Sequence, residues 1–303
     1  MDFDSPSASL GSAAKASILP AVYIVGAGPG DPELLTVKAL KLIQQADVLV
    51  YANSLVPQQI LLAMRPDAEK IATANMTLEA IVPLMIDRVR AGKSVVRLHS
   101  GDPSLYSAIH EQMLRLSEAD VPFEVVPGIS AFQAAAAKLK VELTVPAQVQ
   151  SIILARIGGR TQVPKTEELA GLAAHKASLC LYLSARHVKE SQAQLMMHYS
   201  PQTPVAICFR VGWPDEQIWV VPLEKMAEVS EAENLVRTTL YIVSPALAGA
   251  MEGVQKTDTQ TEIETVRSRL YNPTHDHLFR PNAKRPKEGP EESVEKEQER
   301  AKR

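Results

Sequence analysis

The sequence has little of what several protein classes require. Cysteine occurs twice in 303 residues, as Cys180 and Cys208, and each lies in a short apolar run rather than in a paired spacing. This usage excludes a disulfide framework and a thiolate metal site, and we expect two buried free thiols. Basic residues are not in excess, since 32 Lys and Arg face 35 Asp and Glu, and there are five Phe. A nucleic-acid partner is therefore not expected.

Long apolar runs are also missing. No stretch approaches the roughly 18 apolar residues that span a bilayer, so no membrane partner is expected. The amino end is acidic and then rich in Ser and Ala, unlike a secretory signal, and we expect a cytoplasmic protein. Residues 1–19 are small and polar, and residues 281–303 alternate Lys, Arg and Glu. Neither segment can bury enough surface to offset its ordering entropy, so both are predicted to be disordered tails.

Between these tails, short apolar strands alternate with amphipathic helices. Strands are predicted at 22–26, 48–51, 95–98 and 123–126, and helices after Asp31, after Thr77, over 105–116 and after Ser130. This β-α-β-α order is typical of a mostly parallel sheet that is covered on both faces. It predicts an amino-terminal α/β domain over residues 20–145.

The rhythm restarts after Pro146. Strands are predicted at 151–155, 178–183, 204–211, 217–221 and 239–243, and helices near 167–174 and 187–198. The turn Gly212-Trp213-Pro214-Asp215 separates two of these strands, which predicts a hairpin and hence a mixed sheet. We therefore predict a second α/β domain over 146–250, followed by an extension over 251–280.

The loop Gly26-Ala27-Gly28-Pro29-Gly30-Asp31-Pro32 follows the first strand. A dinucleotide fingerprint needs glycine at its first, third and sixth positions, and the sixth position here is Asp31. A carboxylate at a helix entrance repels a pyrophosphate, and prolines remove backbone donors. The second strand ends in Tyr51-Ala52-Asn53 rather than in the acidic residue of an NAD-dependent dehydrogenase. The loop therefore disfavours a dinucleotide.

Five segments together resemble the tetrapyrrole methylase family. They are Val25-Gly26-Ala27-Gly28-Pro29-Gly30-Asp31-Pro32-Glu33-Leu34-Leu35-Thr36, Tyr51-Ala52-Asn53-Ser54-Leu55-Val56, Arg97-Leu98-His99-Ser100-Gly101-Asp102-Pro103-Ser104-Leu105-Tyr106, Val126-Pro127-Gly128-Ile129-Ser130-Ala131 and Leu181-Tyr182-Leu183-Ser184. The resemblance implies a two-lobed α/β fold with a mostly parallel amino-terminal sheet and a mixed carboxy-terminal sheet. It also implies a homodimer, and S-adenosylmethionine bound in the cleft between the lobes, with S-adenosylhomocysteine as product.

The resemblance further implies which residues contact this cofactor. They are Pro29, Ser100, Gly101, Asp102, Leu105, Ser130, Ala131, Leu183, Val211 and Thr239. Close backbone approach explains why glycine suits position 101. On spacing alone, Asp102 and Ser130 are equally well explained as caps of the helices that follow them. Both explanations stay open at this point.

The late segment Ser268–Arg280, with Tyr271, His275 and His277, resembles the branch of the family that methylates C11 of precorrin-4 or cobalt-precorrin-4 in corrin ring synthesis. The substrate is a large ring with several carboxylates, for which planar bidentate Arg is the natural partner. The substrate-binding candidates are Ser54, Arg97, His99, Arg156, Arg186 and Arg210. No metal site is expected at the His-x-His pair, because Asp276 is the one carboxylate nearby.

Methyl transfer from a sulfonium depends on alignment and on exclusion of water, so the resemblance requires no catalytic triad or metal. No catalytic residue is identified, and His99 is the candidate for moving a proton near neutral pH. Three alternatives stay open: another precorrin as acceptor, RNA as acceptor, and a non-catalytic protein that binds the cofactor or a tetrapyrrole. An RNA acceptor would call for a basic face with stacking aromatics.

Overall fold

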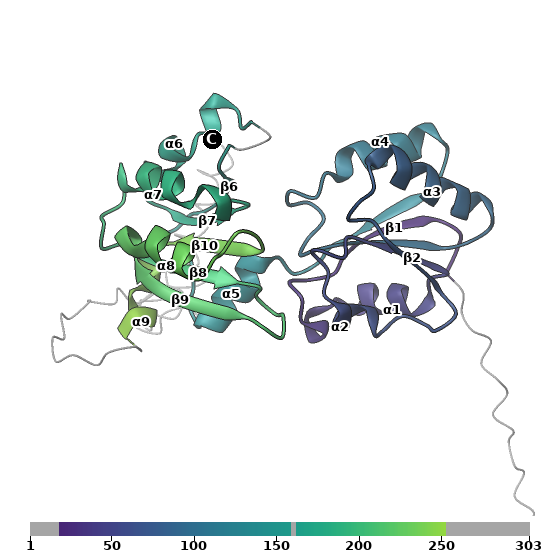
Figure 1. Ribbon diagram of the computed structural model, residues 1–303, viewed down its shortest axis with the longest axis horizontal. Helices are drawn as coiled ribbons and strands as arrows, with labels where there is room; N and C mark the ends of the chain where they lie inside the picture. The colour runs from purple at the N-terminus through teal and green to yellow at the C-terminus, as the bar shows by residue number, and fades with distance from the viewer. Residues whose placement is uncertain (1–17, 159–161, 253–303) are drawn as a thin grey trace, which may run out of the picture.

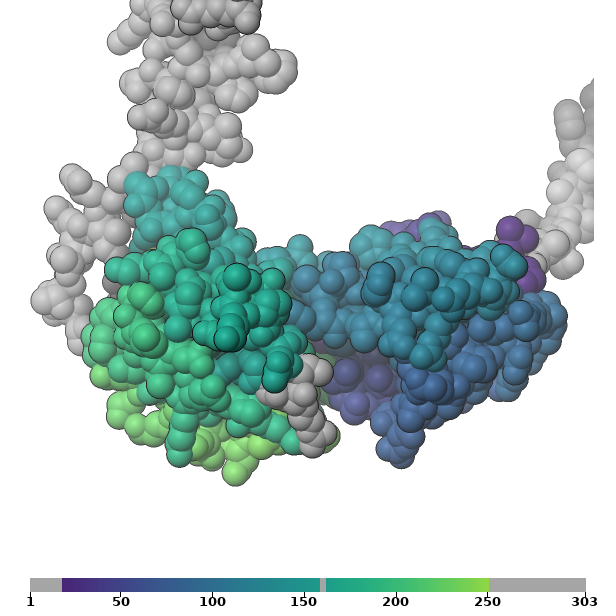
Figure 2. Space-filling view, turned by 90° about the horizontal axis from the view of Figure 1, so that it is seen from above, coloured from purple at the N-terminus to yellow at the C-terminus, as the bar shows by residue number. Residues whose placement is uncertain are grey.

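Two β-sheets organise the chain into two lobes (Figure 1). A computed structural model describes residues 18–158 and 162–252. The predicted tails at 1–19 and 281–303 and the extension at 251–280 lie almost wholly outside these residues. The lobes stand side by side, with a notch between them on one side of the molecule (Figure 2).

The first sheet is wholly parallel. Its strands are β1 (Val22–Gly26), β2 (Val48–Tyr51), β3 (Glu69–Ala72), β4 (Val95–His99) and β5 (Phe123–Val126), in the order β3-β2-β4-β1-β5. Helices α1 (Val37–Gln45) and α2 (Gln58–Leu61) cover one face, and α3 (Leu78–Arg90) and α4 (Ile109–Glu118) cover the other (Figure 1). Tyr23 and Val25 face the first pair of helices, and Val22 and Ile24 face the second. Because both faces are covered, β1 and β2 are apolar, and β4 is apolar apart from Arg97 and His99.

The second sheet is mixed. Its strands are β6 (Ile152–Arg156), β7 (Ser178–Tyr182), β8 (Pro204–Phe209), β9 (Gln217–Pro222) and β10 (Thr239–Val243), in the order β6-β7-β10-β8-β9, with the β6–β7 pair parallel and the other pairs antiparallel. Helices α6 (Leu169–Ala173), α7 (Val188–Met196) and α8 (Met226–Ala232) cover one face, α5 (Ala131–Leu139) covers the other, and α9 (Ala248–Glu252) lies beside β9. Cys180 and Cys208 are buried free thiols on the α5 side, as predicted. The predicted fold class is confirmed.

Several helices begin later than the sequence predicts. Asp31 does cap a helical turn, since its carboxylate accepts from the Glu33 amide at 2.9 Å. That turn is a single 3-10 turn, and α1 starts only after Thr36, whose hydroxyl accepts from the Ala39 amide at 3.1 Å. Helix α4 begins four residues after its predicted start, because Ala108 has a left-handed backbone (φ 51°) that interrupts the helix.

Short 3-10 turns complete the described secondary structure. They are η1 (Pro32–Leu34), η2 (Lys165–Glu167), η3 (Ala185–His187), η4 (Leu223–Lys225) and η5 (Pro245–Leu247). The sequence pattern missed α2, β3 and α8, which are short or carry polar residues on every second or third position. Among the described residues, no helix combines the length and apolarity that crossing a membrane requires.

The change from one core to the other comes earlier than the predicted boundary between residues 145 and 146. Helix α5 follows the last strand of the first sheet, yet its Ala134 and Ala135 pack with Cys180 and Leu240 of the second sheet. In Figure 1, α5 lies in the second lobe. The second lobe therefore begins near residue 130, because an alanine-rich helix fits against either sheet and its sequence does not choose between them.

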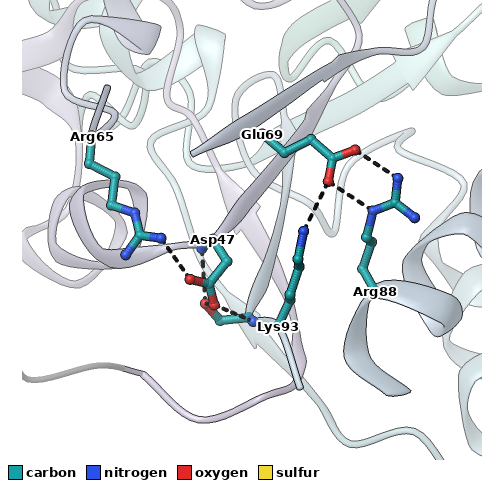
Figure 3. Close-up of polar contacts among 6 residues, drawn as sticks. Asp47, Arg65, Glu69, Arg88 and Lys93 are labelled. Atoms are coloured by element: carbon teal, nitrogen blue, oxygen red, sulfur yellow. Dashed lines mark hydrogen bonds and ion pairs between the residues drawn. The ribbon is translucent and has the colours of Figure 1, made fainter. Parts of the chain in front are cut away.

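Ion pairs close the amino edge of the first sheet (Figure 3). Asp47, just before β2, accepts from the Ser94 amide and hydroxyl at 2.8 and 2.7 Å and pairs with Arg65 at 2.7 Å. Burial alone would raise the pKa of Asp47, but the hydrogen bonds from Ser94 and Arg65 outweigh it and lower the pKa. Glu69, the first residue of β3, receives two hydrogen bonds from Arg88, which lower the pKa of this carboxylate as well. Each charge in this group has a partner.

Candidate functional site

The carboxyl edges of the two sheets face each other, and the predicted site residues gather there. The parallel strands of the first sheet all end at one edge, and β6, β7 and β8 of the second sheet end at the edge where β10 begins. Ligands of α/β sheets bind outside this edge. The first lobe brings Pro29, Ser54, Ser100, Gly101, Asp102 and Leu105 there, and the second lobe brings Arg156, Leu183, Arg186, Arg210, Val211 and Thr239. Ser130 and Ala131 lie where the chain passes from the first lobe to the second.

Three glycines hold the loops of the first lobe together. A Cβ atom on Gly128 would lie 2.3 Å from the Gly101 carbonyl oxygen and 2.9 Å from the Gly26 Cα. Gly28 and Gly101 also exchange backbone hydrogen bonds of 3.2 and 2.7 Å. Gly101 has a φ of +66°, and a Cβ atom there would meet nothing closer than 3.7 Å. This left-handed backbone favours glycine at position 101.

Asp102 joins two of these loops. One carboxylate oxygen accepts from the Gly128 amide at 2.9 Å, and the other accepts from the amide of Ser104 at 2.8 Å and from its hydroxyl. Burial would raise the pKa of Asp102, but these hydrogen bonds outweigh it and lower the pKa. The capping role that spacing suggested is therefore real, although the capped element is a turn, since α4 starts only at residue 109.

Tyr182, at the end of β7, connects the second lobe to Ser130. Its hydroxyl lies 2.8 Å from the Ser130 Oγ and accepts from the Phe132 amide at 3.2 Å, while the Gln133 side chain accepts from the Ser130 amide at 2.9 Å. Burial raises the pKa of Tyr182 to about 12, so the hydroxyl stays protonated. Ser130 is thus a helix cap whose hydroxyl is already engaged. The sequence did not predict this hydrogen bond, because Tyr182 belongs to the apolar pattern of its strand.

Five of the ten described non-glycine residues with a left-handed backbone lie at the same edge. Five non-glycine residues there have left-handed φ angles between 48 and 56°: Tyr106, Ala108, Leu183, Arg210 and Thr238. Such conformations cost on the order of 1 kcal/mol or more each and cluster at functional sites. The Leu183 side chain is 67% exposed although it is apolar. The edge therefore presents an uncovered apolar side chain beside the loops just described.

Arg97 and His99 of β4 point toward α3 and α4 and are buried, with 7% and 8% of their surface exposed. Arg97 donates to the Thr73 hydroxyl at 2.9 Å, while its Nε has no hydrogen-bond partner and no acidic residue pairs with it within the described residues. Burial lowers the pKa of Arg97 to about 10. His99 Nε2 also lacks a partner among the described residues. Burial and the charge of Arg97 lower the pKa of His99 to about 3, so His99 is neutral and a weak base near neutral pH, which counts against its predicted role of moving a proton.

The other candidate substrate residues are more exposed or already paired. Arg210 forms an ion pair with Asp215 and lies over the Phe209 and Trp213 rings, 5.1 and 5.0 Å from their centroids. Arg156, at the end of β6, donates to the Gln162 carbonyl at 2.9 Å. Arg186 in η3 and Ser54 after β2 are exposed. The structure thus brings these residues to one edge without joining them into one cluster.

No group of three His, Cys, Asp or Glu side chains that could hold a metal occurs within the described part of the chain. His275 and His277, and with them the whole segment 268–280, lie outside it. The segment that supported the predicted substrate therefore lies outside the described residues.

Comparison with known proteins places the chain among methyltransferases. A family model described as tetrapyrrole (corrin/porphyrin) methylases matches residues 21–227. A cobalt-precorrin-4 C(11)-methyltransferase of Priestia megaterium is 42% identical over 264 residues, which cover 87% of this chain and 98% of that protein. A precorrin-4 C(11)-methyltransferase of Pseudomonas aeruginosa is 42% identical over 260 residues, which cover 86% of this chain and 98% of that protein.

Solved structures agree with these relatives. The structure of a cobalt precorrin-4 methyltransferase of cobalamin biosynthesis superimposes with a TM-score of 0.73 at 43% identity and covers 75% of this chain and 96% of its own. A uroporphyrin-III C-methyltransferase of Thermus thermophilus, complexed with S-adenosylhomocysteine, superimposes with a TM-score of 0.63 at 30% identity and covers 76% of this chain and 94% of its own.

Proposed function

The chain belongs to the tetrapyrrole methylase family, and on that premise we propose that it transfers a methyl group from S-adenosylmethionine to C11 of precorrin-4 or cobalt-precorrin-4. The observation that carries the proposal is the 42% identity over nearly the whole length of two relatives named for this reaction. One of those names includes cobalt and the other does not, so the proposal covers the ring that both share.

S-adenosylmethionine supplies an activated methyl group on its sulfonium, and the residues present fit this cofactor. The exposed Leu183 offers an apolar surface to an adenine, and the loops after β1, β4 and β5 offer backbone groups opposite it. We place the cofactor against Pro29, Ser100, Gly101, Asp102, Leu105, Ser130, Ala131, Leu183, Val211 and Thr239. Ser130 contributes its backbone there, because its hydroxyl is engaged with Tyr182.

We place one carboxylate arm of the substrate at Arg97. A buried charge without a partner costs several kcal/mol, and a carboxylate that reaches the guanidinium would offset this cost. The free Nε of Arg97 and the neutral His99 supply the hydrogen-bonding groups. Ser54, Arg156 and Arg186 lie around the same edge and are assigned to the remaining arms. Arg210 is the weakest of the candidates, because Asp215 already pairs with it.

The chain acts by alignment and exclusion of water rather than by acid–base chemistry. His99 is a poor base at neutral pH, since its pKa lies at about 3. The proton that leaves the ring carbon therefore passes to water or to a carboxylate of the substrate. The buried hydroxyls and glycine contacts around Gly128 and Tyr182 hold the loops in place during transfer.

The proposal is tested by incubating the full chain with labelled S-adenosylmethionine and a panel of precorrins, followed by mass analysis of the ring. We expect precorrin-4, with or without cobalt, to gain one labelled methyl group. Methylation of a different intermediate would show that the proposed acceptor is wrong. Tight S-adenosylhomocysteine binding without methylation of any ring would favour the non-catalytic binding protein. The homodimer and the cytoplasmic location stay predictions.

A further inference from the structure

One side chain contacts both lobes behind the proposed cofactor loops. Gln59 of α2 donates through Nε2 to the Gly30 carbonyl at 2.7 Å and to the Gly212 carbonyl at 2.9 Å. Because a carboxamide nitrogen carries two protons, both hydrogen bonds form at once. Gly30 follows Pro29 and Gly212 follows Val211, so each accepting carbonyl lies one residue beyond a proposed cofactor contact.

The two loops that Gln59 joins are in direct backbone contact. A Cβ atom on Gly30 would lie 2.6 Å from Cδ1 of Trp213, and one on Gly212 would lie 2.8 Å from the Asp31 nitrogen. Both glycines have positive φ angles, +149 and +80°. A side chain at either position would force the lobes apart, so this approach is built into the two loops.

The second-lobe side of the contact is held independently of Gln59. The Gly212 amide donates to the Glu216 carboxylate at 2.6 Å, and Glu216 pairs with Lys138 of α5 at 3.4 Å. The Arg210 guanidinium lies over the Trp213 ring. The Gly212 carbonyl is therefore a fixed point against which Gln59 can hold the first loop.

We propose that Gln59 is a positioning residue for the cofactor site. It holds the Pro29 loop of the first lobe and the Val211 loop of the second at one separation and thereby sets the affinity for S-adenosylmethionine. This inference rests on the proposed function. Loss of both hydrogen bonds leaves two carbonyls without their donor and lets the walls of the site move independently.

The test compares Gln59→Leu with Gln58→Leu in the full chain. Gln58 is the matched control, because it is the exposed neighbour on the same short helix. Calorimetric titration with S-adenosylhomocysteine is expected to give about tenfold weaker binding for Gln59→Leu, as two lost hydrogen bonds of ordinary strength imply, and no change for Gln58→Leu.

Steady-state kinetics separate positioning from a general structural role. For Gln59→Leu we expect the KM for S-adenosylmethionine to rise about tenfold, while kcat and the KM for the tetrapyrrole stay near the wild-type values. A merely structural residue would lower the melting temperature and change all of these constants together. That result, or equal S-adenosylhomocysteine affinities in Gln59→Leu and wild type, would overturn the inference.

Trp213 provides a readout that does not depend on the proposed function. The chain has two tryptophans, so Trp219→Phe leaves Trp213 as the fluorophore. In that background, Gln59→Leu is expected to increase quenching of Trp213 by acrylamide, and unchanged quenching would count against the contact. Failure of the wild type to bind S-adenosylhomocysteine would instead contradict the proposed function. If Gln59→Leu does not fold, Gln59→Asn, which is one methylene too short to reach both carbonyls, is expected to show the same weaker binding.

Discussion

At the amino edge of the first sheet every charged side chain in Figure 3 has an oppositely charged partner, whereas Arg97 near the carboxyl edge has none among the described residues. Arg65 Nε at the amino edge lacks a hydrogen bond, as Arg97 Nε and His99 Nε2 do, but the Arg65 guanidinium is paired with Asp47 and Asp67. Strand β4 connects the two edges. It begins directly after Ser94, which completes the amino-edge hydrogen bonds, and it ends at His99. The partly exposed ion pairs add modestly to stability, and a buried cation without an acidic partner lowers it. The difference indicates that one edge serves stability and that the other keeps groups available for a ligand.

The largest effect on stability is expected when the glycine contacts at the carboxyl edge are disrupted. Gly128→Ala forces a Cβ atom against the backbone of Gly101 and Gly26, and we expect the free energy of unfolding to fall by about 3 kcal/mol in urea denaturation. The control is Gly171→Ala in α6, where nothing lies within 4 Å of the added atom. It is expected to gain up to about 1 kcal/mol from helix propensity. Equal stability of the two variants would contradict the close packing.

The next effect concerns the amino edge. Asp47→Ala removes the acceptor of Ser94 and Arg65, and we expect a loss of about 2 kcal/mol at neutral pH with unchanged affinity for S-adenosylhomocysteine. Folding lowers the pKa of Asp47, so its contribution is present above the unfolded value of about 4 and is lost as the pH falls through the folded value. The gap between variant and wild type should therefore close in acid. Asp87→Ala, at an exposed position of α3, is the control and should cost little.

The third effect is a pH dependence that belongs to the carboxyl edge. Burial lowers the pKa of His99 to about 3, so between that value and the unfolded one near 6.5 the unfolded chain binds the additional proton. The free energy of unfolding should thus decrease as the pH falls through this window, by about 1 kcal/mol between pH 6 and pH 5 from this group. His99→Gln is expected to lose that slope, and His175→Gln, at an exposed position, to keep it. Denaturation at several pH values measures both, and identical slopes would show that His99 titrates normally.

The smallest expected effect on stability compares one arginine near the carboxyl edge with one arginine at the amino edge. Arg97→Met removes a buried cation that has no acidic partner among residues 18–158 and 162–252, and it is expected to raise the free energy of unfolding by about 1 kcal/mol while the KM for the tetrapyrrole increases. Arg88→Met breaks the pair with Glu69 and is expected to lower the free energy of unfolding without an effect on KM. If both variants lose stability alike, Arg97 is a structural residue and the two edges do not differ in kind.

Much of the fold could be predicted because it depends on local patterns. Strands β1 and β2 are continuous apolar runs, β4 and β5 are largely apolar, the turn at 212–215 indicated the hairpin at 204–221, and Asp31, Thr77 and Ser130 marked helix starts. Short elements with mixed polarity, such as β3, carry no such pattern, since β3 alternates half-buried and exposed residues at the sheet edge. The site residues named from the resemblance reach one edge because strand direction brings them there.

The sequence by itself determined the class of the chain, its two α/β lobes and the loops that carry the site, because hydrophobic period and turn residues are local properties. Only the tertiary structure decided that α5 belongs to the second core, that Arg97 has no acidic partner within the described part of the chain, and that Gln59 contacts a carbonyl 153 residues away. An apolar pattern records that a surface is buried and does not record what covers it. Contacts between distant loops form only when both sheets are in place, so no local pattern of residues predicts them.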